Sequence, residues 1–211
     1  MVYFLYSKSY FILNITYFIK GDFINMLENE IKLCLTKDSY YEIKNTFFIN
    51  NNFQKILQIN YYYDNKNNDL YKNNITLRIR QINDQLTLEA KYPLENDGII
   101  KRKEERSIAL HTFTNSIDLN NPHIKEYIGD ISQYGKVTLL GSLVTERYST
   151  HPFLWLKLDL DYSMYLGKVD YELEIEILSG YEEKAKEFYK DLLIKYPLST
   201  SGKIKRFRKT L

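Results

Sequence analysis

The sequence lacks the residues that cross-link small proteins. Cys34 is the one cysteine among 211 residues, so no internal disulfide can form and nothing favours an oxidising compartment. The three histidines, His111, His123 and His151, are scattered and do not have zinc-ligand spacing with Cys34. A chain of this length can bury a full core without such cross-links, and we therefore expect one globular domain.

An excess of charge of one sign is also missing. The 29 lysines and arginines nearly balance 27 aspartates and glutamates, which leaves a net charge of +2. No overall field therefore steers the chain toward nucleic acid or an anionic membrane, and an electrostatic function must come from local clustering. The sequence likewise has no phosphate-binding Walker loop, no dinucleotide fingerprint and no serine-hydrolase elbow.

Long hydrophobic runs are absent. The apolar stretch from Tyr10 to Ile19 is shorter than the roughly 20 residues that cross a bilayer, and it lacks a small-residue cleavage site. We expect the native domain to start near Met26, with residues 1–25 as an upstream extension of little role. The alternative is that the extension adds a strand or helix to the domain. These absences favour a cytoplasmic location.

The chain does contain a repeated alternation of apolar and charged residues, which is typical of strands. The expected strands cover Glu28–Leu35, Gln54–Tyr63, Ile75–Ile82, Leu86–Lys91, Ile99–Leu110, Ser142–Ser149, Leu154–Asp161 and Tyr171–Ile177. The expected helices cover Asp38–Phe48, Thr114–Ile131 and Tyr181–Tyr196, and a basic tail follows at Lys203–Lys209. This content predicts an antiparallel α+β domain.

The charged faces of these strands allow two arrangements. An antiparallel sheet commonly turns one face to water, which explains most polar faces without any function. A row of like charges such as Glu172, Glu174 and Glu176 is repulsive, however, and needs a cation or a basic partner. Arg78 and Arg80 form a matching basic pair. If the sheet closes with these faces inward, it forms a barrel with a charged lumen, the reverse of a filled small barrel.

Several short motifs occur in order along the chain. They are Glu28-x-Glu30-x-Lys32, the strands Leu77–Arg80 and Leu86–Lys91, Gly141–Leu143 leading to Arg147, and then Asp161–Leu166, Glu172–Glu176 and Gly202–Phe207. In this order they resemble the CYTH superfamily, also called triphosphate tunnel metalloenzymes. The resemblance covers about Leu27 to Phe207. It is closest to stand-alone bacterial CYTH proteins and extends more distantly to thiamine triphosphatase and class IV adenylate cyclase.

The resemblance implies a fold and a ligand. The fold would be a closed antiparallel eight-stranded β-barrel, a tunnel with a polar lumen and helices packed outside, formed by residues 26–211. The tunnel would bind a triphosphate, and its phosphate oxygens would be held by Lys32, Arg78, Arg80, Lys91, Arg147, Lys203 and Arg206. Arginine suits this task because it grips phosphate through two donors, whereas lysine acts as a compact point charge.

The same resemblance implies a Mg²⁺ or Mn²⁺ cofactor, held by Glu28, Glu30, Glu105, Asp161, Glu172, Glu174 and Glu176. Both ions prefer hard carboxylate oxygens. The expected catalytic residues are Lys32 together with Glu105 and Asp161, which would complete a second metal position. Three glutamates stand on the last strand where two are needed, so Glu176 either replaces Glu172 as a ligand or lies near the rim.

Three other positions are ambiguous or depart from the family. Only one of the adjacent Glu104 and Glu105 can face inward, and the parity of the strand favours Glu105. Asp159 shares the parity of Asp161 and competes with it for the same role. Glu89 lies where other members tend to have an uncharged residue.

We therefore expect metal-dependent hydrolysis of a triphosphate, either inorganic tripolyphosphate or a small organic triphosphate, by in-line attack of a metal-activated water. The rivals are a class IV adenylate-cyclase reaction, in which the α-phosphate reacts and pyrophosphate leaves, and non-catalytic binding of polyphosphate or nucleotide. RNA binding is a third alternative. The expected partner is the small-molecule triphosphate, without nucleic acid or membrane, and the expected state is a monomer or homodimer.

Overall fold

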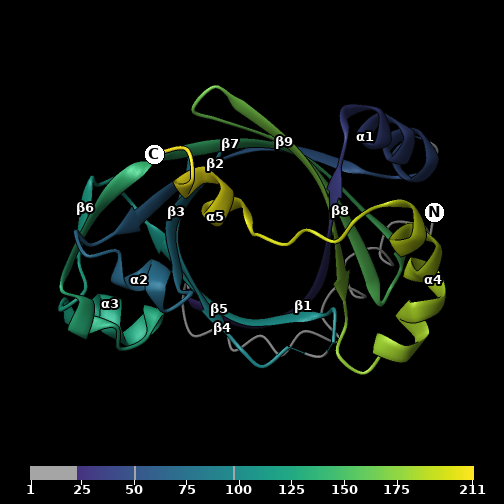
Figure 1. Cartoon of the computed structure of the whole chain (residues 1–211). Coiled ribbons are helices and arrows are strands. Elements are labelled where there is room, and N and C mark those ends of the chain that lie inside the picture. Colours follow the sequence, from purple (N-terminus) through teal and green to yellow (C-terminus); the bar gives the residue numbers. More distant parts are fainter. Residues whose placement is uncertain (1–22, 50, 97) are drawn as a thin grey trace, which may run out of the picture.

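One closed antiparallel sheet organises the part of the chain that the computed structural model describes, residues 23–49, 51–96 and 98–211 (Figure 1). Its strands are β1 (Phe23–Leu35), β2 (Gln54–Asp64), β3 (Thr76–Ile82), β4 (Gln85–Pro93), β5 (Lys101–Leu110), β6 (Ser116–Asp118), β7 (Lys136–Phe153), β8 (Leu156–Tyr165) and β9 (Lys168–Ile177). Their order is β2-β3-β4-β5-β1-β9-β8-β7-β6, and β2 also pairs with β7. That pairing closes eight of the described strands into a barrel, which confirms the predicted α+β fold.

Most helices lie outside the barrel, on two sides of it (Figure 1). The helices are α1 (Lys37–Ile43), α2 (Asp69–Lys72), α3 (Pro122–Ile128), α4 (Glu182–Lys195) and α5 (Lys203–Arg208), with a π-helical turn at Lys44–Phe48 and a 3₁₀ turn at Ser132–Tyr134. Tyr40 of α1 and Ala185 of α4 pack on the apolar residues of β1, β8 and β9. Leu70 of α2 and Ile128 of α3 pack on those of β3 and β4. The expected helix Asp38–Phe48 is thus confirmed, and the Thr36 side chain caps it by accepting from the Ser39 backbone.

The apolar and charged faces of the strands are both buried, in opposite directions. Ile31 and Leu33 of β1 belong to the outer core under the helices, and neither is exposed. The alternate residues Glu30 and Lys32 are also buried although they are charged. The same inversion occurs in β9, where Glu174 is buried opposite an apolar face. Because helices cover the apolar face, the charged face is left to line the lumen.

The C-terminal helix α5 differs from the others because it packs toward the barrel interior (Figure 1). Its residue Phe207 has no exposed surface and forms a cluster with Tyr62, Leu143 and Tyr165. Gly141 of β7 lies directly against the Phe207 ring, since a Cβ at that glycine would be 2.9 Å from the ring's Cζ atom. This packing fixes α5 and thereby places Lys203 at the lumen.

Two predicted elements are wrong in part. The expected helix Thr114–Ile131 contains a short strand, β6, and becomes helical only at Pro122. The Asn121 side chain caps that helix by accepting from the His123 backbone, and proline fits only in the first turn of a helix. The expected strand Leu154–Asp161 begins two residues late, because Leu154 lies in the turn between β7 and β8 and is 86% exposed.

The basic tail and the amino end also differ from expectation. Residues 203–208 form helix α5, and Arg208 donates to the buried Asp64 carboxylate 2.9 Å away rather than pointing to solvent. At the other end, β1 includes residues 23–25 of the expected extension, while residues 1–22 lie outside the described part of the chain. The domain boundary near Met26 stays a prediction. None of the helices in the described residues has the length and apolar character needed to span a membrane.

The contact between Gly141 and Phe207 gives a prediction about stability. Gly141 has a φ of +151°, which only glycine adopts readily, and the buried ring cannot swing away from an added methyl group. We expect Gly141→Ala to lower the free energy of unfolding by about 2–4 kcal/mol, as backbone strain plus overpacking, in urea titrations. Gly135→Ala is the control: its φ of +68° is also unfavourable but no atom lies within 4 Å, so the loss should be smaller. Equal losses would show that Phe207 does not press on this site.

Candidate active site

The inward faces of the strands enclose a cavity with about 190 Å³ of water-accessible space. Most of the expected site residues line it. The basic ones are Lys32, Arg78, Arg80, Lys91, Arg147 and Lys203, and the acidic ones are Glu28, Glu105, Glu174 and Glu176. Glu30, Asp161 and Glu172 are buried directly behind this lining and touch its lysines and arginines. The residues predicted from motifs spread along the sequence therefore meet around one space.

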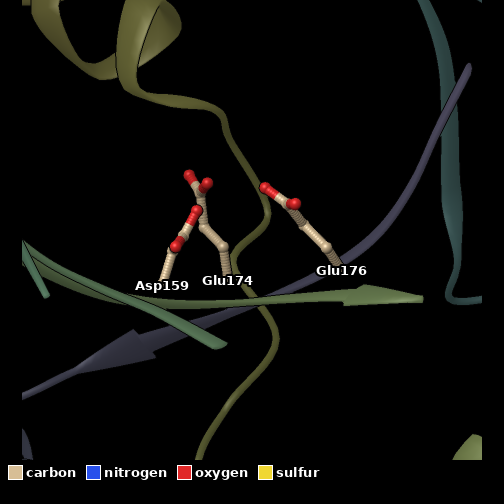
Figure 2. A group of neighbouring side chains, drawn as sticks. All are labelled: Asp159, Glu174 and Glu176. Carbon is tan, nitrogen blue, oxygen red and sulfur yellow. The ribbon is translucent and has the colours of Figure 1, made fainter. Parts of the chain in front are cut away.

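One wall of the cavity, formed by β8 and β9, is acidic. The register places Asp159 opposite Glu174, and Asp161 opposite Glu172. Figure 2 shows the side chains of Asp159, Glu174 and Glu176 rising from the same face of the sheet. Asp159, Glu174 and Glu176 form one group of carboxylates whose oxygens lie within 4.8 Å of one another, and Asp161, Glu172 and Glu174 form a second. Glu174 belongs to both groups.

Basic side chains hold these carboxylates together. Arg147 donates to Asp159 at 2.6 Å, to both oxygens of Asp161 at 2.7 and 2.6 Å, and to Glu174 at 2.7 Å. The Nζ atom of Lys203 lies 2.7 Å from Asp161 and 2.5 Å from both Glu172 and Glu174. Lys203 thus occupies the centre of the second carboxylate group.

These contacts set the protonation of the acidic wall. Burial alone would raise the pKa of Glu174, but the charges of Lys203, Lys32 and Arg147 hold that pKa well below its ordinary value. Burial likewise opposes ionisation of Asp159, yet Arg147 and Lys157 lower its pKa. For Glu176 the balance is reversed, because burial and the neighbouring Asp159 raise its pKa to about 8. The wall therefore joins fixed carboxylates with one that titrates near neutral pH.

A second wall, formed by β3, β4 and β5, carries the remaining phosphate-ligand candidates. Lys91 donates to both oxygens of Glu28 at 2.7 Å and lies 2.5 Å from Glu105. Glu105, as expected, is the inward residue of the adjacent glutamate pair, whereas Glu104 pairs with Arg106. The buried Oε2 atom of Glu105 has no aligned hydrogen-bond donor. The same oxygen is nevertheless the one that lies 2.5 Å from the Lys91 ammonium group, so Lys91 neutralises it.

Two lysines of the cavity lining, Lys103 and Lys157, were not specified by the motifs, and one expected arginine lies outside the lining. Lys103 contacts Glu30, and burial together with the nearby Lys32 lowers the pKa of Lys103. Lys157 lies 2.8 Å from Asp159 and 3.1 Å from Glu176. Strand parity is the signal that could have found both lysines, because each shares the inward face of its strand. Arg206, an expected phosphate ligand, is held outside the cavity lining by Asp170 and Glu172 at 2.6 and 3.0 Å.

The carboxylate groups fit a divalent metal ion by their chemistry. Mg²⁺ and Mn²⁺ bind hard carboxylate oxygens, and two groups of three such residues converge on the acidic wall. The sequence left open whether Glu172 or Glu176 is the ligand. In the structure each belongs to a different carboxylate group, and Glu174 belongs to both groups. Asp159, weighed against Asp161 in the sequence, has its own place in the first group.

Comparisons with known proteins agree with this architecture. The sequence model of the CYTH domain matches residues 26–207. A comparison with curated protein sequences gives no match. The fold is similar to a Hippeastrum protein assigned as an adenylyl cyclase and found to have a dominant triphosphatase activity, with 21% identity over 86% of this chain and 95% of that one, and a TM-score of 0.66.

Two further solved structures share the fold. A Bacillus halodurans protein assigned as an adenylate cyclase is 25% identical over 87% of this chain and 98% of that one, with a TM-score of 0.64. A Pyrococcus horikoshii protein is 19% identical over 82% of this chain and 91% of that one, with a TM-score of 0.53. The likeness extends over nearly the full length of each of these proteins.

The contacts of Arg147 give a prediction that depends on pH. Arg147→Gln leaves the fully buried Asp159 and Asp161 without their main cation, so we expect a loss of about 3–5 kcal/mol in the free energy of unfolding at pH 7.5. Without the arginine, the pKa values of Asp159 and Glu174 rise in the folded state, which then binds more protons than the unfolded state. Stability of the variant should therefore fall as pH rises, and the loss should be smaller at pH 5.

The control for this experiment is Lys55→Gln, which breaks a surface pair with Glu146 in which the lysine is 51% exposed. We expect a much smaller loss than from Arg147→Gln at either pH, because solvent screens such pairs. Urea titrations of both variants measure the difference. Equal losses in the two variants, or a loss from Arg147→Gln that is the same at pH 5 and pH 7.5, would contradict the assigned role of Arg147.

Proposed function

The chain belongs to the CYTH domain family, and from this premise we propose that it hydrolyses a triphosphate in a metal-dependent reaction. The substrate would be inorganic tripolyphosphate or a small organic triphosphate, and the reaction an in-line attack of water on the terminal phosphoryl group. One observation carries the proposal: the basic and the acidic side chains share a single enclosed cavity instead of decorating the outer surface.

The charge of the cavity suits a polyanion. Among the described residues, eight basic side chains and four carboxylates line it. A triphosphate carries several negative charges and needs several fixed cations when it leaves bulk water. Arg147 and Lys203 approach it from the acidic wall and Arg78 and Arg80 from the β3 wall, so one elongated anion would touch both. Lys32 lies between Glu30 and Glu174 and would hold a phosphate oxygen near the acidic wall.

The acidic wall supplies the reactive end of the site in this proposal. Asp159, Glu174 and Glu176, or Asp161, Glu172 and Glu174, would hold a divalent cation through their carboxylate oxygens. When bound, such a cation neutralises charge on phosphoryl oxygens and makes water a better nucleophile. Arg147 and Lys203 keep the carboxylates at fixed positions and ionised, so that they are ready to bind cations. No covalent nucleophile is required for this reaction.

A cyclase reaction is the second candidate. It is favoured by the Bacillus halodurans structure, which is 25% identical and was assigned as an adenylate cyclase. The same cavity would then hold ATP with its α-phosphate at the acidic wall, and pyrophosphate would leave. Hydrolysis remains the first candidate because it needs only the phosphate grip and the acidic wall. Cytoplasmic location, a monomeric or dimeric state and the absence of nucleic-acid or membrane partners belong to this proposal as expectations.

The central position of Glu174 gives a test of catalysis. We expect Glu174→Gln to lower the turnover of tripolyphosphate in Mg²⁺ or Mn²⁺ buffer by about 100-fold or more, because both carboxylate groups lose a member. Glu28→Gln should act in the same direction. The measurement is phosphate release, with a thermal melt to check folding. Glu187→Gln on the exposed surface of α4 is the control and should leave turnover unchanged. Wild-type turnover in both lumen variants would disprove the proposal, and tight binding without turnover in any metal would identify a non-catalytic binder.

The products formed from ATP separate the two reactions. Hydrolysis of the terminal phosphoryl group gives orthophosphate and ADP, whereas a cyclase gives cyclic AMP and pyrophosphate. We expect orthophosphate without cyclic AMP, measured by chromatography of the nucleotide products. Tripolyphosphate, thiamine triphosphate and GTP, each assayed with Mg²⁺, Mn²⁺ and Ca²⁺, rank the substrates in the same screen. Cyclic AMP as the main product would instead support the cyclase alternative.

A further inference from the structure

Glu89 is a charged residue to which the proposed reaction gives no role. It lies on β4 opposite Arg78 of β3, and only 4% of it is exposed. The described residues that line the cavity include Arg78 and Arg80 but not Glu89. Glu89 therefore lies behind the two arginines, where a bound phosphate would not reach it first.

A single carboxylate oxygen of Glu89 contacts both Arg78 and Arg80. Its Oε2 atom accepts from Nε of Arg78 at 2.7 Å and lies 2.6 Å from Nη2 of the same side chain. Nη2 of Arg80 is 3.3 Å from that oxygen, and Nε of Arg80 donates to Asn60 at 3.4 Å. The two guanidinium groups are thus drawn to a common point on the wall. Two arginines left without this carboxylate would repel each other.

The guanidinium of Arg78 is held but not saturated. Its Nη2 atom is buried and has no aligned hydrogen-bond acceptor, although Glu89 is close. Nη2 is nonetheless 2.6 Å from the Glu89 carboxylate, so Glu89 contacts this side of the guanidinium through both Nε and Nη2. Glu89 fixes the Nε side of the fork, and the remaining donors are left for a second anion. A tetrahedral phosphoryl group with several oxygens suits two converging guanidinium groups.

The position of this pair in the barrel decides which phosphoryl group it would meet. Figure 1 places β3 and β8 on opposite sides of the barrel, so the arginines face the cavity from a different side than the carboxylate groups of β8 and β9. If the reacting phosphoryl group lies at the acidic wall, the arginine pair contacts a phosphoryl group that does not react. Such a contact is equally strong in the ground state and the transition state, and it affects KM rather than kcat.

We propose that Glu89 is a positioning residue that holds Arg78 and Arg80 in one orientation, so that together they grip a non-reacting phosphoryl group of the substrate. This inference rests on the proposed function, because it concerns the phosphate grip of the same cavity. It departs from the simplest electrostatic expectation, in which a carboxylate beside the phosphate-binding arginines only weakens the binding of an anion.

The experiment compares Glu89→Ala and Glu89→Gln with the wild-type chain. Kinetics with tripolyphosphate give kcat and KM, and calorimetry in EDTA gives the Kd of tripolyphosphate without metal. We expect Glu89→Ala to raise KM and Kd about 10-fold to 100-fold, with kcat changed by less than about threefold. Glu89→Gln keeps a carbonyl oxygen that accepts from Arg78 and should recover most of the affinity. Glu104→Ala on the neighbouring strand, which removes a pair with Arg106 outside the cavity lining, should change none of these values.

The other possible results decide for or against the inference as follows. Tighter binding of tripolyphosphate by both Glu89 variants would show that the carboxylate competes with phosphate. A fall in kcat at unchanged KM would place Glu89 in the chemical step. If Glu89→Ala does not fold, Glu89→Gln decides. A small rise in KM with kcat retained agrees with positioning, whereas an unchanged KM or a loss of kcat contradicts it. If the wild-type chain neither binds nor hydrolyses tripolyphosphate or any other triphosphate tested, the proposed function fails, and the inference fails with it. If the wild-type chain is active and Glu89→Ala has the same KM, Kd and kcat, the inference is wrong but the proposed function stands.

Discussion

A carboxylate as deeply buried as Asp159 or Asp161, whose side chains have no exposed surface, is tolerated only beside a fixed cation. The lumen satisfies this constraint by interleaving acids and bases from different strands. Arg147 of β7 forms ion pairs with carboxylates of β8 and β9, and Lys203 of α5 pairs with carboxylates of the same two strands. Lys91 of β4 pairs with carboxylates of β1 and β5. Each of these cations therefore neutralises carboxylates on elements other than its own. The closed barrel is therefore required to bring the opposite charges together, and the charges in turn penalise any opening of the barrel.

The inverted barrel follows from the same constraint. A charged face cannot pack against helices, so the alternate, apolar face must turn outward, and the helices α1, α2, α3 and α4 cover it. The hydrophobic cores are consequently two layers outside the sheet rather than one core inside it. In a filled barrel, a ligand cavity could be made only by removing core side chains and losing their packing contacts. Here the interior can hold a ligand because the apolar packing lies outside the sheet. Of the helices in residues 23–49, 51–96 and 98–211, α5 alone packs toward the interior, and Phe207 anchors it among Tyr62, Leu143 and Tyr165.

Strand parity explains how much of this could be predicted from the sequence. A period of two residues fixes which side chains share a face, so Glu28, Glu30 and Lys32 could be placed together, and the ordered motifs indicated closure. The register between two paired strands cannot be predicted from the sequence of either strand alone. It decides that Asp159 faces Glu174 and that Lys157 reaches Glu176, neither of which the motifs specified. The segment Thr114–Ile131 misled because its polar residues fit a helix surface, whereas the proline at position 122 and the cap at Asn121 restrict the helix to its second half.

The position of Lys203 links cation and anion binding. Its ammonium group lies within 2.7 Å of three carboxylates that together suit a divalent ion. Two positive centres cannot share that position, since their repulsion at such a distance is large in a buried site. If Asp161, Glu172 and Glu174 held a divalent ion, the Lys203 ammonium group would have to leave that position, and because Phe207 anchors α5, a side-chain movement would suffice. A displaced ammonium group needs a new acceptor, and a triphosphate in the cavity provides one. Metal and triphosphate would thus favour each other's binding, and by linkage the benefit is the same in both directions.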